Sequence, residues 1–379
     1  MRVFSLLLAA TCLSGPVFAQ TPRVASDIAP VHGLVSRVMA GVGVPDLILP
    51  PGASPHSYAM RPSEARALAQ ADMVVLVGPA LTPWLSGSLE ALAPDAVRLE
   101  WMQSATLLPF REGALFDGHD HAHGSEADGH EDHDAHDDHD AHEDEHHAAD
   151  EHQTHDDHAA KHEDHDAHGH EDHATQGHED HDAKDHAEHA PKGDDEHHAE
   201  DHAAQWDPHV WLDPANGSAF LMRIAQELGA LDPKNAETYL SNARAGQAEL
   251  AALTDRIASE MTAVQGRPFV VFHDAYHYFE ARFDVEAVAS INQADDSAAS
   301  AGRLAEVRDA AQTANIACFF TEPQAPEGLV EAVAGREGAR IGIIDPIGAE
   351  IALGADFYPA LMTQIATSFS ECLSEDAQK

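Results

Sequence analysis

Short apolar runs alternate along the chain with segments in which apolar residues recur every three or four positions. The continuous runs "MVVLV" at 73–77 and "FVVF" at 269–272 are typical of parallel strands that are buried on both faces. The segments at 61–70 and 302–312 have the helical period instead. This alternation of strands and helices predicts an α/β fold.

The predicted units form two groups with one long helical segment between them. The first group has strands near 23–27, 44–49 and 72–77, with a turn at Pro30 before its first helix; the second has strands near 268–273, 285–291, 315–320 and 339–344. Between the groups, one face of a helix over 233–265 contains Leu250, Leu253, Ile257, Met261 and Val264. The pattern predicts two α/β lobes with mostly parallel sheets, joined by one long rigid helix.

Residues 118–204 depart from this pattern. The tract contains 25 of the 30 histidines and no Val, Ile, Leu, Met, Phe, Tyr, Trp or Cys. Such a segment cannot bury enough apolar surface to offset the entropy of ordering, so we expect a disordered acidic loop inserted in the N-terminal lobe. Most of the net charge of −45 lies in the tract. The acidic balance argues against nucleic acid as a partner, because phosphate binding needs clustered Lys and Arg.

The first residues have the features of a secretory signal peptide. A basic start is followed by the apolar stretch Val3–Leu13, and Ala19 ends a small-residue cleavage site. The apolar stretch is shorter than the roughly 18–20 residues that span a bilayer. We therefore expect an exported protein; a lipoprotein attached through Cys12 is the alternative.

The expected organisation follows from these segments. It comprises a signal peptide (1–19), the first part of the N-terminal lobe (20–117), the His-rich loop (118–204), the end of that lobe (205–232), the linking helix (233–265) and the C-terminal lobe (266–379).

Export also makes the cysteines informative. After cleavage only Cys318 and Cys372 remain, and disulfides persist in oxidising compartments. We expect a bridge that pins the last helix to a strand. Two free buried thiols are the alternative.

Five histidines lie outside the tract, and three of them stand at strand ends or before a helix. These three are His56 in "PPGASPHSYAMRPS", His209 in "WDPHVWLDP" and His273 in "VVFHDAY". Ligands of open α/β sheets bind at the carboxyl ends of the strands. Three imidazoles leave one position of a zinc tetrahedron open. The positions therefore predict a metal site.

Five motifs in order resemble one known family. "PPGASPHSYAMRPSE", "DPHVWLDP", "FVVFHDAYHYFE", "FTEPQ" and "IIDPIGAEI" are similar to the ZnuA-like periplasmic zinc-binding subunits of bacterial ABC zinc importers. The resemblance covers nearly the whole mature chain and includes the acidic His-rich insert, the central helix and the late cysteine pair. It implies a periplasmic protein with the two-lobed fold of metal-binding ABC solute-binding proteins.

The resemblance also implies a ligand set. The three family histidines fall on His56, His209 and His273, and the late aspartate, which binds metal in manganese-type relatives, falls on Asp345. Many zinc-type members have a glutamate beside the first histidine, where this chain has Pro55. The fourth ligand is then Asp345, a water molecule or a histidine of the tract.

The ligand types favour zinc. His273 stands where manganese-type relatives have a glutamate, and neutral imidazoles suit Zn(II) better than Mn(II). Copper and nickel also suit such a site. Among the remaining candidates, His32 is expected to be structural, and His277 to lie at the surface or beside the ligands. Glu322 is a candidate to orient a ligand histidine through its second nitrogen, and Asp274 is either a helix N-cap or a functional group.

The favoured function is therefore binding rather than catalysis. The resemblance implies capture of Zn(II) between two lobes by a monomer, docking on the membrane permease of a zinc ABC transporter, and a periplasmic accessory protein that donates zinc. The closely spaced histidines of the tract are expected to collect zinc or hand it over. Alternatives are a zinc-dependent periplasmic hydrolase, for which no His-Glu-x-x-His helix appears outside the tract, and a zinc buffer or adhesin without transport.

Overall fold

The computed structural model describes residues 21–111, 113–116, 206–292, 299–326, 328–335 and 339–374. The predictions of a signal peptide at 1–19 and of a disordered loop at 118–204 fall outside these residues. The described chain contains two four-stranded parallel sheets with helices, so the predicted α/β class is confirmed.

The first sheet forms the centre of the N-terminal lobe, by which we mean the sheet and its helices. Its strands lie in the order β2-β1-β3-β4 and are all parallel. They are β1 (Val24–Ser26), β2 (Asp46–Leu47), β3 (Met73–Leu76) and β4 (Val97–Glu100). The helices that follow them are α1 (Ala29–Val38), α2 (Pro62–Ala69) and α3 (Ser86–Leu92), with short 3-10 turns at Pro83–Leu85 and Trp101–Gln103.

Two features of this lobe differ from the sequence prediction. The apolar pattern did not single out β4, because it is an edge strand in which only Leu99 is buried. The turn predicted at Pro30 is wrong. Pro30 lies in the first turn of α1, where proline is well tolerated because its missing N–H has no partner in a helix anyway.

The second sheet, with its helices, forms the C-terminal lobe. Its strands are also parallel, in the order β6-β5-β7-β8. They are β5 (Phe269–His273), β6 (Ala287–Asn292), β7 (Cys318–Thr321) and β8 (Ile341–Ile343), and all four lie where the apolar runs predicted them. The helices are α6 (His277–Phe283), α7 (Ala301–Ala314), α8 (Leu329–Ala334) and α9 (Phe357–Leu373).

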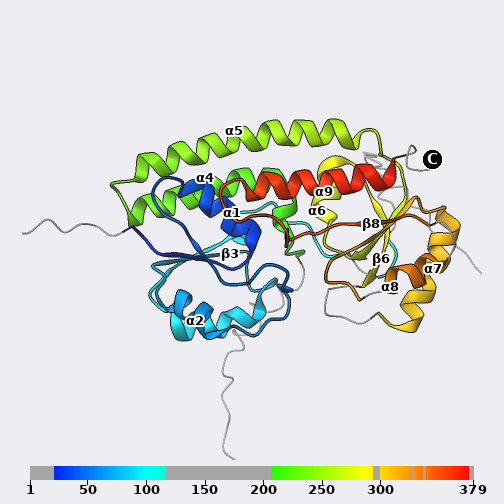
Figure 1. The fold of residues 1–379 in the computed structure, drawn as a ribbon, viewed down its shortest axis with the longest axis horizontal. Helices are drawn as coiled ribbons and strands as arrows, with labels where there is room; N and C mark the ends of the chain where they lie inside the picture. The colour runs from blue at the N-terminus through cyan, green and yellow to red at the C-terminus, as the bar shows by residue number, and fades with distance from the viewer. Residues whose placement is uncertain are drawn as a thin grey trace, which may run out of the picture. The chain divides into compact units, whose positions relative to one another are not determined.

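Two helices connect the sheets, and the second is the predicted long one. They are α4 (Pro214–Leu231) and α5 (Ala236–Met261), preceded by a 3-10 turn at Val210–Leu212. The predicted apolar face of α5 is buried, and α5 contacts α1 and α4 as well as α6 and α9. The long α5 runs beside α4 and α9 in Figure 1. One continuous apolar core therefore extends through both lobes.

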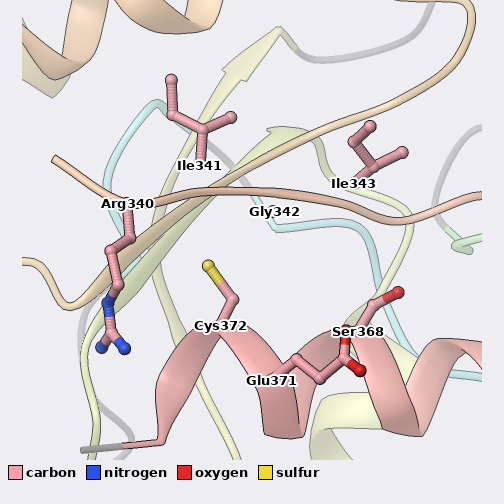
Figure 2. Close-up of a pocket in the computed structure, with 7 residues that line it drawn as sticks. All are labelled: Arg340, Ile341, Gly342, Ile343, Ser368, Glu371 and Cys372. Carbon is pink, nitrogen blue, oxygen red and sulfur yellow. The ribbon is translucent and has the colours of Figure 1, made fainter. Parts of the chain in front are cut away.

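Cys318 and Cys372 form the predicted disulfide, which ties β7 to α9. The close approach of β8 depends on Gly342, where an added Cβ would come within 3.0 Å of the Cys372 Sγ. A pocket lies over this region, lined by Arg340, Ile341, Gly342, Ile343, Ser368, Glu371 and Cys372 (Figure 2). None of the candidate metal ligands lines it. None of the helices in the described ranges is long and apolar enough to cross a membrane.

Candidate metal centre

His273 is placed by the centre of the C-terminal sheet. It is the last residue of β5, whose five residues are all buried and which pairs with β6 on one side and β7 on the other. The strand direction puts its imidazole at the carboxyl edge of the sheet, and the side chain is only 1 % exposed.

His209 is placed by a tight turn before α4. The Asp207 Oδ1 accepts a 2.9 Å hydrogen bond from the His209 backbone N–H, which closes the turn. The neighbouring Trp211 is buried, and its indole Nε1 donates to the carbonyl of Pro346 at 2.7 Å. This bond joins the His209 turn to the segment that follows β8.

His56 comes from the loop between β2 and α2. Gly52 adopts a φ of 81°, which favours glycine, and the His56 N–H donates to the Ser54 Oγ at 3.3 Å. The indole Nε1 of Trp84 donates to the Pro55 carbonyl at 2.8 Å and so holds the residue before the histidine. His56 itself is half-buried.

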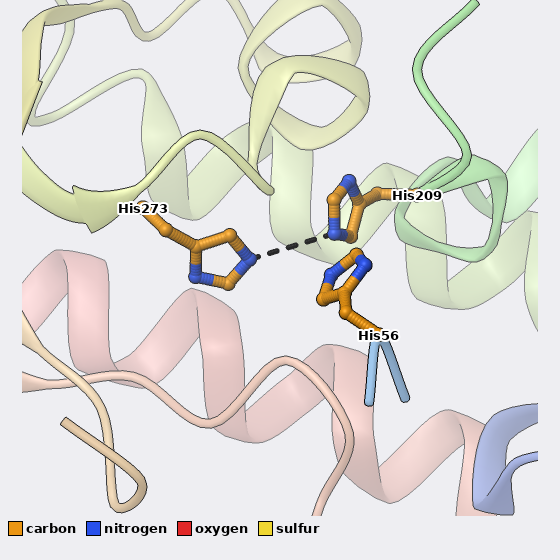
Figure 3. Close-up of side chains that lie close together, drawn as sticks. All are labelled: His56, His209 and His273. Atoms are coloured by element: carbon orange, nitrogen blue, oxygen red, sulfur yellow. Dashed lines mark hydrogen bonds between the residues drawn. The ribbon is translucent and has the colours of Figure 1, made fainter. Parts of the chain in front are cut away.

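The three imidazoles converge although they lie far apart in the sequence. One ring nitrogen from each lies within 4.8 Å of the other two. Figure 3 shows the rings facing one another, with the Nε2 atoms of His209 and His273 3.5 Å apart. Nitrogens bound to one zinc ion at about 2.0–2.1 Å in a tetrahedron are about 3.4 Å apart. The separation of this pair is therefore already close to that of a loaded site.

In two of these rings the second nitrogen, Nδ1, lies within hydrogen-bond distance of a carboxylate oxygen. The His209 Nδ1 lies 2.7 Å from the Asp207 Oδ1, and the His273 Nδ1 lies 2.7 Å from the Glu322 Oε1. The Tyr276 hydroxyl also donates to the Glu322 Oε1, at 3.0 Å. A carboxylate on Nδ1 holds the proton there and leaves the Nε2 lone pair for a metal, which also makes the imidazole a stronger ligand.

The predicted role of Glu322 agrees with this geometry, whereas Asp207 was missed. Its signal in the sequence is the Asp-x-His spacing, which lets one carboxylate contact both the backbone and the ring of the histidine two residues later. Asp207 is buried, and burial raises its pKa to about 7.

Asp345 lies in the turn after β8 and is buried. Its Oδ1 accepts backbone N–H bonds from Ile347 at 3.1 Å and Gly348 at 2.9 Å, and its Oδ2 accepts one from Ala349 at 2.6 Å. The group of converging ligand atoms within the described residues consists of the three histidines and does not include Asp345. Its role as a fourth ligand therefore stays a prediction.

The weaker candidates have other partners. His32 is structural as expected, buried in α1 with its Nε2 3.1 Å from the Pro45 carbonyl. His277 begins α6 while His273 ends β5, so the two do not share a helix face. Burial lowers the pKa of His277, whose Nδ1 lies 4.0 Å from the Asp207 Oδ2.

Asp274 is not the N-cap of α6, which begins after Tyr276. Its carboxylate instead forms an ion pair with Arg111, a residue that the sequence pattern did not single out. Asp274, which follows the candidate ligand His273, is thus held by the charge of a residue 163 positions away in the sequence.

Comparisons with known proteins agree with this picture. The family described as "Zinc-uptake complex component A periplasmic" matches residues 24–372. The high-affinity zinc uptake system protein ZnuA of Brucella suis biovar 1 is 37 % identical over 380 residues, covering 99 % of both chains. That of Paracoccus denitrificans is 37 % identical over 379 residues, covering 99 % of this chain and all of its own.

A solved structure has the same fold. A crystal structure of ZnuA superposes with a TM-score of 0.63 at 20 % identity, covering 93 % of this chain and 100 % of that one. Because the family match spans residues 24–372 and two relatives match almost end to end, the chain belongs to the ZnuA family, the periplasmic components of zinc-uptake complexes.

Proposed function

We propose that the protein captures a zinc ion in the periplasm with His56, His209 and His273 and delivers it to the membrane permease of an ABC importer. The observation that carries this proposal is the convergence of three imidazole nitrogens, two of them with their second nitrogen on a buried carboxylate. Zinc is here the cargo. The protein is a binding subunit and not an enzyme, in keeping with its family.

The ligand set supports zinc over harder cations. Three neutral imidazoles suit zinc, copper and nickel, while Mg(II), Ca(II) and Mn(II) prefer oxygen ligands. Bound metal needs neutral rings, and unperturbed imidazole has a pKa of about 6.5. Zinc affinity therefore falls as the solution is acidified below that pH.

The fourth position is proposed to be filled by Asp345 or a water molecule rather than by a tract histidine. Three backbone N–H groups fix the Asp345 carboxylate, so its use as a ligand requires the 345–349 turn to bring it to the ring nitrogens. A water molecule fills the position without any such movement.

The tract at 118–204 is proposed to collect zinc and pass it to this site. Most of its histidines lie two to four positions from the next one, so many pairs can hold an ion weakly. Weak sites tethered beside a strong one raise the local zinc concentration. We further propose that the protein acts as a monomer and accepts zinc from a periplasmic accessory protein.

Calorimetric zinc titration tests the site. The mature chain and a version lacking residues 118–204 are each titrated with and without His56→Ala. One tight site that survives the deletion and is lost with His56→Ala supports the proposal. A tight site that disappears with the deletion means that the tract supplies an essential ligand.

A matched control removes a histidine that is not a candidate ligand. His32→Gln also deletes one buried imidazole, and the variant is expected to keep the tight site. Titrations with copper and nickel in the deletion variant then measure how far the site discriminates among these metals.

A further inference from the structure

Two segments that flank the His-rich tract are joined to each other and to α6. The Asp207 N–H donates to the Leu108 carbonyl at 2.9 Å, and Pro109 and Trp206 form a β-bridge. The Tyr278 hydroxyl accepts from the Leu108 N–H at 3.0 Å and donates to the Asp207 carbonyl at 2.8 Å. The chain leaving the N-terminal lobe and the turn that carries His209 are thus bonded to the same helix of the C-terminal lobe.

The chain before the tract also adds to the C-terminal sheet. The Phe116 N–H donates to the Val288 carbonyl at 2.9 Å, and the Ser290 N–H donates to the Ala114 carbonyl at 3.1 Å. Residues 114–116 therefore pair antiparallel with β6, the edge strand of that sheet.

Arg111 lies between these two sets of bonds. Its guanidinium pairs with the carboxylate of Asp274 and donates to the Glu280 oxygens at 2.7 and 3.2 Å. The same group lies over the Phe116 ring, 3.7 Å from the centroid. The Arg111 side chain is 9 % exposed, Asp274 6 % and Glu280 3 %. A planar guanidinium fits such a two-carboxylate arrangement in a way that a lysine ammonium does not.

The cluster contacts the supports of two of the three proposed ligands. Asp274 directly follows His273, so the ion pair with Arg111 fixes the backbone on which that imidazole is mounted. Arg111 lies two positions after Pro109, whose bridge partner Trp206 precedes the Asp207–His209 turn. Release of a chelated ion requires its ligands to separate, and these contacts oppose that separation.

We propose that Arg111 is a positioning residue that determines how long a captured zinc ion stays in the lobe site. It holds the His273 loop against the segment that supports the His209 turn, so that both rings stay near one metal position. The inference rests on the proposed function of His56, His209 and His273 as zinc ligands. It assigns to Arg111 an effect on zinc dissociation rather than on association, because Arg111 contacts the residue next to a proposed ligand and is not itself a ligand.

Zinc dissociation from the intact mature protein tests the proposal. Arg111→Lys keeps the charge but not the double carboxylate contact, and zinc release is followed with a chromogenic chelator in stopped flow. The site is identified as the slow phase that His56→Ala removes. We expect Arg111→Lys to accelerate that phase at least tenfold and to change the association rate less than threefold.

The matched control is a second arginine, which joins α6 to the N-cap residue of α4. Arg282 donates to both Asp213 oxygens, at 2.7 and 2.6 Å, and contacts neither Asp207 nor Asp274 in the bonds described above. Arg282→Lys is expected to lower the melting temperature without accelerating the slow phase beyond twofold. Equal acceleration in both variants means general loosening of the lobes and overturns the proposal.

A second variant keeps the test decisive if Arg111→Lys does not fold. Glu280→Gln preserves the side-chain shape and the acceptor for the Ala287 N–H while removing one charge from the cluster. A faster slow phase in Glu280→Gln supports the proposal, and an unchanged one contradicts it. Failure of the unmodified protein to show any slow phase instead contradicts the proposed zinc site itself, so the two failures are distinguishable.

Discussion

The two sheets hold their histidines by different means. His273 ends a fully buried central strand and has its Nδ1 on Glu322. His56 lies in the long loop between β2 and α2 and is half-buried, and the indole of Trp84 donates a hydrogen bond to the carbonyl of the preceding Pro55. The C-terminal sheet is also tied to α9 by the disulfide.

This difference predicts that the two proposed ligands are not held equally firmly. Strand ends and buried carboxylates give one ligand a fixed position, which lowers the entropy lost when a metal binds. A loop ligand is more easily moved, and a transported ion must be released as well as bound. We therefore expect His273 to be the more firmly positioned of these two proposed ligands.

Removing the disulfide is expected to have the largest effect. Cys318 and Cys372 are 54 positions apart, and loop-closure entropy gives a bridge of that length about 4 kcal/mol. The double variant Cys318→Ser, Cys372→Ser should lose roughly that much unfolding free energy in denaturant titrations. A much smaller loss means that packing alone stabilises the C-terminal lobe. The disulfide then does not distinguish the support of His273 from that of His56.

Replacing His273 or His56, the two ligands compared above, with alanine should have the next largest effect. Structural zinc sites are worth roughly 10–16 kcal/mol over four ligands, so each loss costs about 3 kcal/mol, or roughly a hundredfold in Kd. His273→Ala should also lower the melting temperature of the metal-free protein, because it leaves a cavity in a buried region, whereas His56→Ala should change it little. Chelator competition and thermal scans measure both. Equal changes in melting temperature in the two variants contradict the distinction between a ligand held at a strand end and a ligand in a loop.

The buried carboxyl group of Asp27 makes the stability of the N-terminal lobe depend on pH. Burial raises the pKa of Asp27 to about 7 from 3.8, against hydrogen bonds from the N–H groups of Ile28 and Val77. The folded state then binds more protons than the unfolded chain between those values, so stability falls as pH rises, by up to about 1.4 kcal/mol per unit. Asp27→Asn should remove the share of this slope that Asp27 contributes between pH 5 and 7. A difference from the unmodified protein that is constant with pH contradicts the raised pKa.

Glu322→Gln sharpens the comparison at the fixed ligand. The amide keeps the shape but replaces the carboxylate that holds the His273 Nδ1 proton, and such partners are worth about 10–100-fold in metal affinity. Zinc competition titrations should show a loss in that range. An unchanged affinity means that the strand alone positions His273.

Trp84→Phe should have the smallest effect. It deletes the hydrogen bond to the Pro55 carbonyl but keeps an aromatic ring against Tyr58, and one such bond is worth about 1 kcal/mol, roughly fivefold in Kd. The melting temperature should stay nearly constant while zinc release becomes faster. A loss as large as that of Glu322→Gln means that the loop is held as firmly as the strand.

Particular residues show how far prediction from sequence extends. The apolar runs 73–77 and 269–272 predicted central strands, because both faces of such strands are buried. The strand β4 was not predicted, because it lies at the edge of its sheet and only one of its four residues is buried and apolar. Glu322 was identified from its place at a strand end. For Asp274 the sequence left a helix N-cap and a functional group open, and neither predicts its ion pair, because its partner Arg111 lies in a distant segment with no local signal.

The sequence alone determined the α/β class, the long helix, the disulfide pair and the three histidines at strand and turn positions, because each depends on local periodicity or on residue chemistry. Only the tertiary structure decided that residues 56, 209 and 273 bring their nitrogens within 4.8 Å, and that Arg111 pairs with Asp274 and Glu280. These contacts join segments more than 60 positions apart. Their distances depend on how the sheets and helices pack together, and no local sequence pattern encodes that packing.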